Sequence, residues 1–264
     1  MELRCFRLGL LLLFLGCAGA CGHSARLPVS AGIGPHPELP APEKSLLPLV
    51  NVVSAKGWST GQHPTAAEGL SVVAYAAGLD HPRWIYVLPN GDVLIAETNA
   101  PPRPEDAKGL RGWFFRRSQK KAGGAVPSAN RILLLRDVDG DGVAETRSVF
   151  LSGLTSPFGM VLVGASLGLA YAAKTALTER FQKGMFIGQH GSWNRKPRSG
   201  YKVIFVPFSA GQPSGDPIDV LTGFVKENGD AMGRPVGVAI DARGALLVAD
   251  DIGNTIWRII KSDR

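Results

Sequence analysis

Two distant stretches of the chain share one pattern of apolar and polar positions. Residues 81–97 and 234–250 align without a gap, and each has a proline, an apolar run, a turn ending in glycine, and a second apolar run. Each stretch then stops at an acid, Glu97 or Asp250. Two β-branched runs joined by a glycine turn are typical of a β-hairpin. The pattern therefore predicts two similar hairpins.

Each predicted hairpin is followed by another apolar run that opens with asparagine, over residues 130–135 and 254–259. Residues 185–188 and 201–206 are further candidate strands, on either side of the polar segment 189–200. Repeated units of three or four antiparallel strands are typical of propeller blades. A β-sandwich with two similar hairpins is the alternative that fits the same pattern.

A third unit begins at Ser156-Pro157 and continues through apolar residues to Val163. After Gly164 the expected turn and acid are missing, and the small and apolar stretch 165–171 follows instead. The repeat therefore breaks at this point of the chain.

The N-terminal residues have the order of a secretory signal: two arginines, the apolar run 8–15, and small residues up to Cys21. The apolar run is shorter than the ~20 residues that a spanning helix needs. We expect a signal peptide at residues 1–21, a Pro/Ala-rich tether at residues 22–56, and one β-domain at residues 57–264.

Cys21 follows small residues and resembles the acylated cysteine of bacterial lipoproteins, with Cys17 as a second candidate. Ordinary cleavage near Ala20 without a lipid is the alternative. All three cysteines lie before residue 22, so the predicted domain has no thiol for a disulfide, a zinc site or nucleophilic catalysis. We expect an exported, periplasmic protein that a lipid anchor holds to a membrane.

The formal net charge is +7, and much of the excess lies in one basic and aromatic segment. Export argues against nucleic acid as the partner. A basic loop with aromatic side chains can rest on anionic lipid, or it can be a solvated insertion whose aromatics cover an edge of the core. The segment contains Lys108, Arg111, Trp113, Phe114, Phe115, Arg116, Arg117, Lys120 and Lys121.

Alternating carboxylates between two predicted strands resemble a calcium loop, because a hard ion needs several oxygens converging on a tight turn. The closing acid comes earlier than in an EF-hand, and no helices are expected beside it. An empty Asp/Gly turn is the alternative. The candidate ligands are Asp137, Asp139, Asp141 and Glu145.

The polar segment 189–198 carries an imidazole, a hydroxyl, an amide, an indole and three cations between two predicted strands. Loops of this kind usually face a ligand, and the cations suit a carboxylate-bearing one. The alternative is a surface turn in which Trp193 covers the core and His190 caps a strand.

These motifs resemble the soluble quinoprotein glucose/sorbosone dehydrogenase family, from about Gly57 to the C-terminus. The resemblance implies an exported six-bladed β-propeller that binds pyrroloquinoline quinone (PQQ) and calcium and oxidises an aldose or a sorbosone-type aldehyde by hydride transfer. It is carried by His81-Pro82-Arg83-Trp84, residues 88–93, residues 188–195, residues 233–238 and Ala249-Asp250-Asp251.

By the same resemblance, Arg234 and either Lys202 or Arg195 hold the carboxylates of PQQ. His190 faces the same pocket, as a contact to the quinone or the sugar. The family's catalytic base is a different histidine, on a section that this chain lacks.

The chain is too short for six blades, so we expect an all-β, incomplete propeller of about three to four blades, with an internal deletion near Gly164. Loss of the base predicts an impaired PQQ-dependent oxidoreductase. The alternative is a non-catalytic, lipid-anchored fragment that acts in binding or self-assembly, because open strand edges invite pairing with another copy. Another propeller enzyme, such as a lactonase, would need a further set of metal-binding acids.

Overall fold

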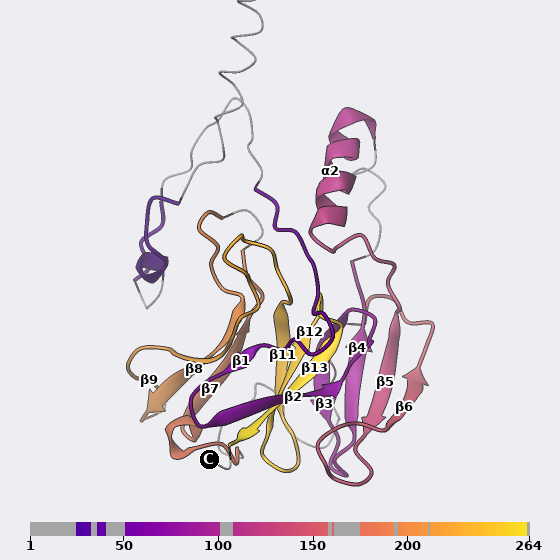
Figure 1. The fold of residues 1–264 in the computed structure, drawn as a ribbon, viewed down its shortest axis with the longest axis vertical. Coiled ribbons are helices and arrows are strands. Elements are labelled where there is room, and N and C mark those ends of the chain that lie inside the picture. The colour runs from indigo at the N-terminus through magenta and orange to yellow at the C-terminus, as the bar shows by residue number, and fades with distance from the viewer. Residues whose placement is uncertain are drawn as a thin grey trace, which may run out of the picture. The chain divides into compact units, whose positions relative to one another are not determined.

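The computed structural model describes residues 25–32, 36–40, 51–100, 108–157, 160, 175–192, 195–210 and 212–262 (Figure 1). The chain divides into two compact units, residues 1–52 with 193–199, and residues 53–192 with 200–264. In the first unit, the described residues include one short 3₁₀ helix, η1 (Val29–Gly32). The predicted signal peptide and Cys21 lie outside the described residues.

The second unit is built of three antiparallel sheets, which confirms the all-β prediction. One has the order β3 (Pro82–Val87), β4 (Val93–Glu97), β5 (Arg131–Arg136), β6 (Thr146–Leu151). Another has the order β11 (Pro235–Ile240), β12 (Leu246–Asp250), β13 (Thr255–Lys261), β2 (Leu70–Ala76). The third has the order β1 (Thr65–Ala66), β10 (Ile218–Thr222), β8 (Lys202–Ser209), β7 (Gly184–Gln189), with β9 (Gln212–Pro213) beside β8.

Both predicted hairpins form, and they have the same construction. In β3–β4 the proline pairs with Glu97, and in β11–β12 the proline pairs with Asp250. In each hairpin the register shifts immediately after that proline. Strands β5 and β13 continue the two sheets as the asparagine-led runs predict, and the predicted pairing of β7 with β8 is also confirmed.

One edge strand of each sheet takes part in a close approach: β7, β11 and β3. Two glycines make this approach possible. A Cβ added at Gly188 on β7 would lie 2.6 Å from the Val236 carbonyl oxygen on β11. A Cβ added at Gly237 would lie 2.9 Å from the Arg83 carbonyl oxygen on β3. Any larger residue would force the strands apart. The β11 sheet therefore lies between the other two.

The apolar core has two layers, one on each side of the β11 sheet. Phe205 and Val220 pack with residues of the β11 sheet in one layer, and Ile95 and Leu133 do so in the other. The side chains of Leu246 and Leu247, neighbours on β12, are fully buried in opposite layers. This alternation is why β12 is apolar along nearly its whole length.

The backbone has the same conformation immediately before strands β5 and β13. Asn130 and Asn254, which precede β5 and β13, have φ values of 48° and 50°. Each accepts one backbone N–H at its carbonyl and another at its Oδ1, over 2.9–3.1 Å. The donors are Leu79 and His81 for Asn254, and Leu154 and Ser156 for Asn130.

His81 and Ser156 both precede a proline and have φ values of 55° and 46°. The predicted third repeat therefore begins with the same asparagine-bonded, positive-φ residue as the first repeat. Most of its continuation, including residues 161–174, lies outside the described residues.

The basic and aromatic segment corrects our expectation of a loop. Residues Gly109–Lys121 form a helix, α2, and Trp113, Phe114 and Phe115 are 49%, 63% and 40% exposed. These aromatics therefore do not cover an edge of the core. The segment is rich in Arg, Lys and Gln, which favour helices. Its consecutive aromatics lack the helical spacing that would have signalled one. The described residues contain no helix with the length and apolarity that crossing a membrane requires.

Candidate functional site

Polar side chains gather where the edge strands β3, β7 and β11 lie near the end of β12. His81 and Arg83 lie at the start of β3, Arg234 immediately precedes β11, His190 follows β7, and Asp251 follows β12. Because β3 and β11 run antiparallel to the strands that end at the acids, these positions share one end of the sheets. The close approach of the glycine-bearing strands brings them together.

Asp251 is the centre of this cluster. Its Oδ2 accepts hydrogen bonds from Nε2 of His190 at 2.9 Å and from Nη1 of Arg83 at 2.5 Å. Nε2 of His81 lies 3.7 Å from the same oxygen. The Asp251 side chain is 1% exposed, and its Oδ1 is buried with no hydrogen-bond partner among the described residues.

The cluster has a defined charge state. Burial opposes ionisation of Asp251, but the hydrogen bond from His190 and the nearby cations outweigh it, and its pKa lies below the ordinary value. Burial lowers the pKa of His81, and the charge of Asp251 offsets this only in part. At neutral pH the site therefore holds an ionised Asp251 and a neutral His81.

Arg234 is buried, at 6% exposed, and its guanidinium lacks protein partners on one side. Its Nε and Nη2 are buried with no hydrogen bond in the described residues. The guanidinium carbon lies 5.8 Å from the ring centroid of Tyr201, and Asp251 N donates to the Arg234 carbonyl. Buried donors of this kind are nearly always satisfied, so these two nitrogens indicate a place for an acceptor, preferably an anion.

Asp250 positions Arg234 without neutralising it. Its Oδ1 accepts the backbone N–H groups of Arg234 and Gly253, at 2.7 and 2.8 Å. Its Oδ2 accepts the indole N–H groups of Trp58 and Trp257, at 2.7 and 3.1 Å. Burial raises the pKa of Asp250, and these four bonds oppose the rise. Each oxygen thus accepts two hydrogen bonds from the protein, so the Asp250 carboxylate has a structural role.

Of the predicted cofactor-binding residues, His190 and Arg234 both contact Asp251, the first through its ring and the second through its backbone carbonyl. Nζ of Lys202 lies 2.6 Å from Asp219 Oδ1 on β10. Arg195 belongs to the first unit, where its Nη2 donates to the Leu27 carbonyl. Trp193 and Asn194 lie outside the described residues.

The sequence interpretation missed Asp251, His81 and Arg83 as site residues. All three stood within the motifs that carried the family resemblance. Their convergence depends on the order of the sheets, which one unaligned sequence does not show. The paired acids Asp250-Asp251 at the end of a buried strand were the available signal.

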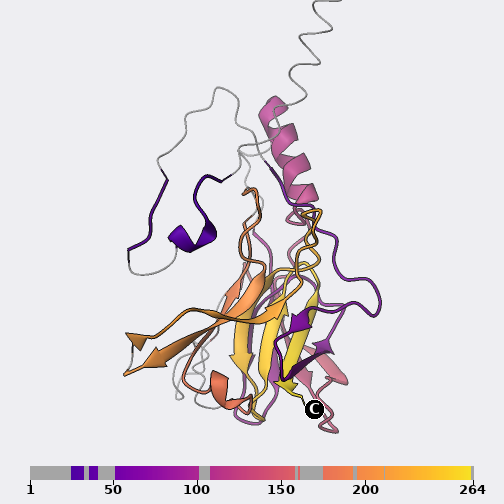
Figure 2. The same ribbon diagram turned by 60° about the vertical axis from the view of Figure 1, so that its left-hand side comes forward.

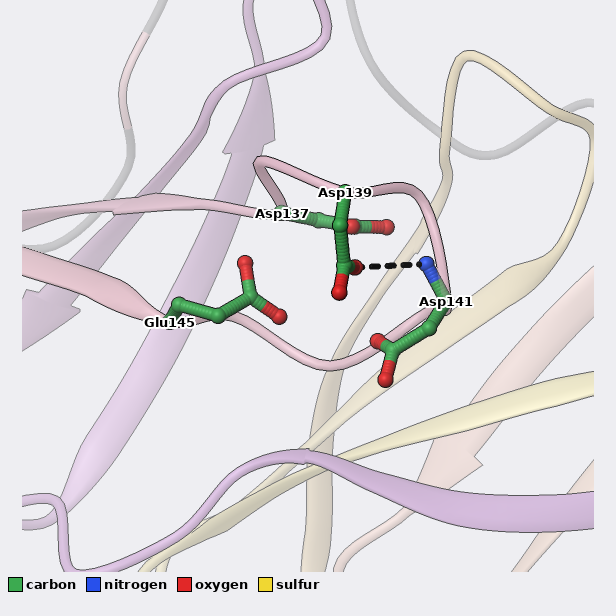
Figure 3. A group of neighbouring side chains, drawn as sticks. All are labelled: Asp137, Asp139, Asp141 and Glu145. Atoms are coloured by element: carbon green, nitrogen blue, oxygen red, sulfur yellow. Dashed lines mark hydrogen bonds between the residues drawn. The ribbon is translucent and has the colours of Figure 1, made fainter.

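The predicted calcium ligands do lie together, on the loop between β5 and β6 (Figure 3). One ligand atom from each acid can be chosen so that all four lie within 4.8 Å of one another. Asp137 accepts the N–H groups of Gly140 and Gly142 and pairs with Arg243. The other three carboxylates are exposed, so the loop is pre-shaped by its own backbone bonds while most of its oxygens face solvent. The three exposed acids are Asp139, Asp141 and Glu145.

A family model and one relative each match part of the chain. The family model described as TrAA12-like matches residues 144–262. An uncharacterized protein from Borreliella burgdorferi is 32% identical over 96 residues, which are 36% of this chain and 25% of the relative. The chain thus matches about a quarter of that relative's length.

Two solved structures were also found. The holo form of the PQQ domain of pyranose dehydrogenase from Coprinopsis cinerea has 14% identity and a TM-score of 0.39, over 80% of this chain and all of that one. The calcium structure of a Trichoderma reesei protein of carbohydrate-active enzymes family AA12 has 11% identity and a TM-score of 0.39, over 75% and 97%. The sequence likeness is therefore to the TrAA12-like family, over the residues that include His190, Arg234 and Asp251.

Proposed function

We propose that this chain descends from PQQ-dependent oxidoreductases and binds PQQ at the Arg234–Asp251 cluster. The observation that carries the proposal is the buried guanidinium of Arg234, whose Nε and Nη2 have no partner in the described residues. PQQ is a tricarboxylate, and a carboxylate is the group that a two-nitrogen donor edge binds best. The TrAA12-like match over residues 144–262 covers this arginine and supports the proposal.

In this proposal each residue has its own part. Arg234 holds a carboxylate of the cofactor, and the ring of Tyr201, with its centroid 5.8 Å from the guanidinium carbon, lies beside it. His190, held by Asp251 at 2.9 Å, presents its ring to the quinone or the sugar. Bound PQQ supplies the hydride acceptor for oxidation of an aldose or a sorbosone-type aldehyde. Lys202 or Arg195 holds a second carboxylate, and Lys202 would have to leave its ion pair with Asp219 to do so.

The oxidoreductase is impaired in this chain. General-base catalysis needs a base within hydrogen-bond reach of the substrate hydroxyl, and the family's histidine falls on the section that the chain lacks. In this proposal the three sheets are blades of an incomplete propeller. The signal peptide and a lipid on Cys21 place the domain in the periplasm, at a membrane.

A binding experiment tests the cofactor claim. Titration of the folded chain with PQQ, followed by calorimetry, should give a dissociation constant in the micromolar range or below. Arg234→Met should weaken binding by about tenfold to a hundredfold, because it removes charge-assisted hydrogen bonds. The matched control Arg180→Met removes an exposed cation and should bind as the wild type does. A wild-type chain that is folded by circular dichroism but binds no PQQ would overturn the proposal.

We further propose that the loop of Asp137, Asp139, Asp141 and Glu145 binds structural calcium. Four carboxylates within 4.8 Å repel one another when ionised, so a hard cation should relieve that repulsion. Millimolar CaCl₂ should raise the Tm of the wild type, and Asp141→Asn should reduce the shift. An equal shift in both proteins would contradict the site.

The alternative function, self-assembly of a non-catalytic fragment, is favoured by strand β6. This edge strand is exposed along its whole length, and Val149, Phe150 and Leu151 are 54%, 50% and 47% exposed. An apolar strand that has no partner beyond β5 among the described residues is suited to a second copy of this chain. Light scattering should then report a defined oligomer that Phe150→Lys disrupts and Val138→Lys, in a loop, does not. A wild-type monomer would contradict the alternative.

A further inference from the structure

Helix α2 combines cations and aromatics in an unusual way for a surface helix. Its 13 residues include no acid. Trp113 and Phe114 stack edge to face with centroids 4.9 Å apart, and the guanidinium of Arg117 lies 5.8 Å from the Trp113 ring. Single exposed apolar residues are ordinary on a protein surface. Three consecutive exposed aromatics beside a run of cations form a patch, and such a patch usually has a partner.

The aromatics of α2 precede most of its cations along the helix, and Arg111 is the one cation before them. The aromatics occupy positions 113–115, and the last turn carries Lys120 and Lys121. At a rise of 1.5 Å per residue, Phe114 and Lys120 lie about 9 Å apart along the axis. Interfacial helices bury their apolar side ~5–10 Å into the boundary between headgroups and acyl chains, so an aromatic cluster and a cation cluster this far apart can contact the two levels of one interface.

The basic end of α2 is the end fixed to the domain. The carbonyl of Lys121 accepts the N–H of Ala55, and a Cβ added at Gly123 would meet the side chain of Ile252. Asn99 Nδ2 donates to the carbonyls of Gly124 and Val126 at 3.0 and 2.7 Å. The aromatic half therefore extends away from the sheets, as Figures 1 and 2 show.

The attachment of α2 is also next to the candidate site. Ile252 directly follows Asp251, and Asn99 lies two residues beyond Glu97, at the same end of the sheets. Whatever α2 binds therefore faces the end of the domain that carries Arg234 and His190.

We propose that α2 inserts its aromatic half into an anionic lipid surface and so turns the candidate site toward the membrane. The cations of its second half complement phosphate headgroups, and the aromatic cluster suits the acyl boundary. This role does not depend on the proposed cofactor or on the lipid on Cys21.

Tryptophan quenching by brominated lipid tests the depth of α2. The leader, or a lipid on Cys21, can hold every variant on the vesicle, so the readout is the depth of residue 113 and not the amount bound. With full chain on brominated phosphatidylglycerol vesicles, Trp113→Phe should lose most of the quenching, although it keeps an aromatic ring and removes only one of the chain's five tryptophans. Brominated phosphatidylcholine vesicles should give little quenching in either protein.

Charge removal gives the second readout. The triple variant Arg117→Gln, Lys120→Gln, Lys121→Gln should weaken the α2-dependent quenching at a fixed lipid concentration, by about fivefold in the local equilibrium for insertion of α2 for each cation near the anionic surface. The matched control removes three exposed lysines elsewhere, at positions 183, 226 and 261, and should quench as the wild type does. Equal quenching in wild type and Trp113→Phe would overturn the proposal. So would equal losses in the two triple variants, which would leave only a net-charge effect.

Discussion

The hairpins β3–β4 and β11–β12 have the same length, proline position and register shift, yet their final acids are satisfied in different ways. Glu97 meets cations: its Oε2 accepts from Arg131 Nε at 2.6 Å, and Arg147 lies 3.5 Å from its Oε1. Asp250 meets only neutral donors, two indoles and two backbone N–H groups.

This difference explains where the site lies. In the first hairpin the neighbouring arginine, Arg131, is neutralised by Glu97 and by Asp80 at 2.6 Å. In the second, indole and backbone donors satisfy Asp250, so Arg234 keeps a guanidinium edge for a ligand. The same hairpin thus serves once as a structural joint and once as a binding element.

The largest expected effect is from Asp250→Asn. An amide offers one acceptor, so its NH₂ must face either the two indoles or the two backbone N–H groups, and two buried donors lose their partners. We expect a loss of about 3–5 kcal/mol in the free energy of unfolding, measured in urea. Asp216→Asn, at an exposed carboxylate, should change it little. A loss below that of Glu97→Gln would break the comparison.

Gly233→Ala should have the next largest effect. A Cβ at this position would lie 2.1 Å from Asp250 Oδ2, which the four donors hold in place. The aligned residue of the first hairpin is Asp80, so the need for glycine is peculiar to the second. We expect a loss of about 2–3 kcal/mol from overpacking, with Gly124→Ala as the control because it meets only ordinary contacts.

Glu97→Gln should cost less, about 1–2 kcal/mol, because Arg131 is 28% exposed and keeps its ion pair with Asp80, although Glu97 itself is buried. Salt sharpens the contrast between the hairpins. Added NaCl should narrow the stability gap between wild type and Glu97→Gln, but not the gap between wild type and Asp250→Asn. Parallel salt responses would show that the two acids are compensated alike.

The smallest effect is a pH slope from His81. Because its pKa is lower in the folded protein, the unfolded chain binds the proton first as the pH falls below about 6.5, and stability decreases with acidification. Asp250, with its raised pKa, acts in the opposite sense. The difference between wild type and His81→Asn should isolate the His81 slope.

The sequence predicts the hairpins well because the signals for a hairpin are local. A glycine turn between β-branched runs determines residues 82–97 whatever surrounds them. The bond between His190 and Asp251 spans 61 positions and depends on which sheets are neighbours. Close approach at Gly188 and Gly237 sets that order, and no periodicity encodes it. Helix α2 was missed because its apolar residues are consecutive.

Strand β2 has a consequence for the order of synthesis. It pairs with β13, so that Leu70 lies opposite Lys261 and Ala76 opposite Ile256. The middle sheet therefore cannot be completed until a strand near the end of the chain has joined one made far earlier. Contacts this distant in sequence slow folding. During synthesis, β2 stays unpaired until β13 has been made. A chain truncated before Thr255 would leave β2 without its partner strand.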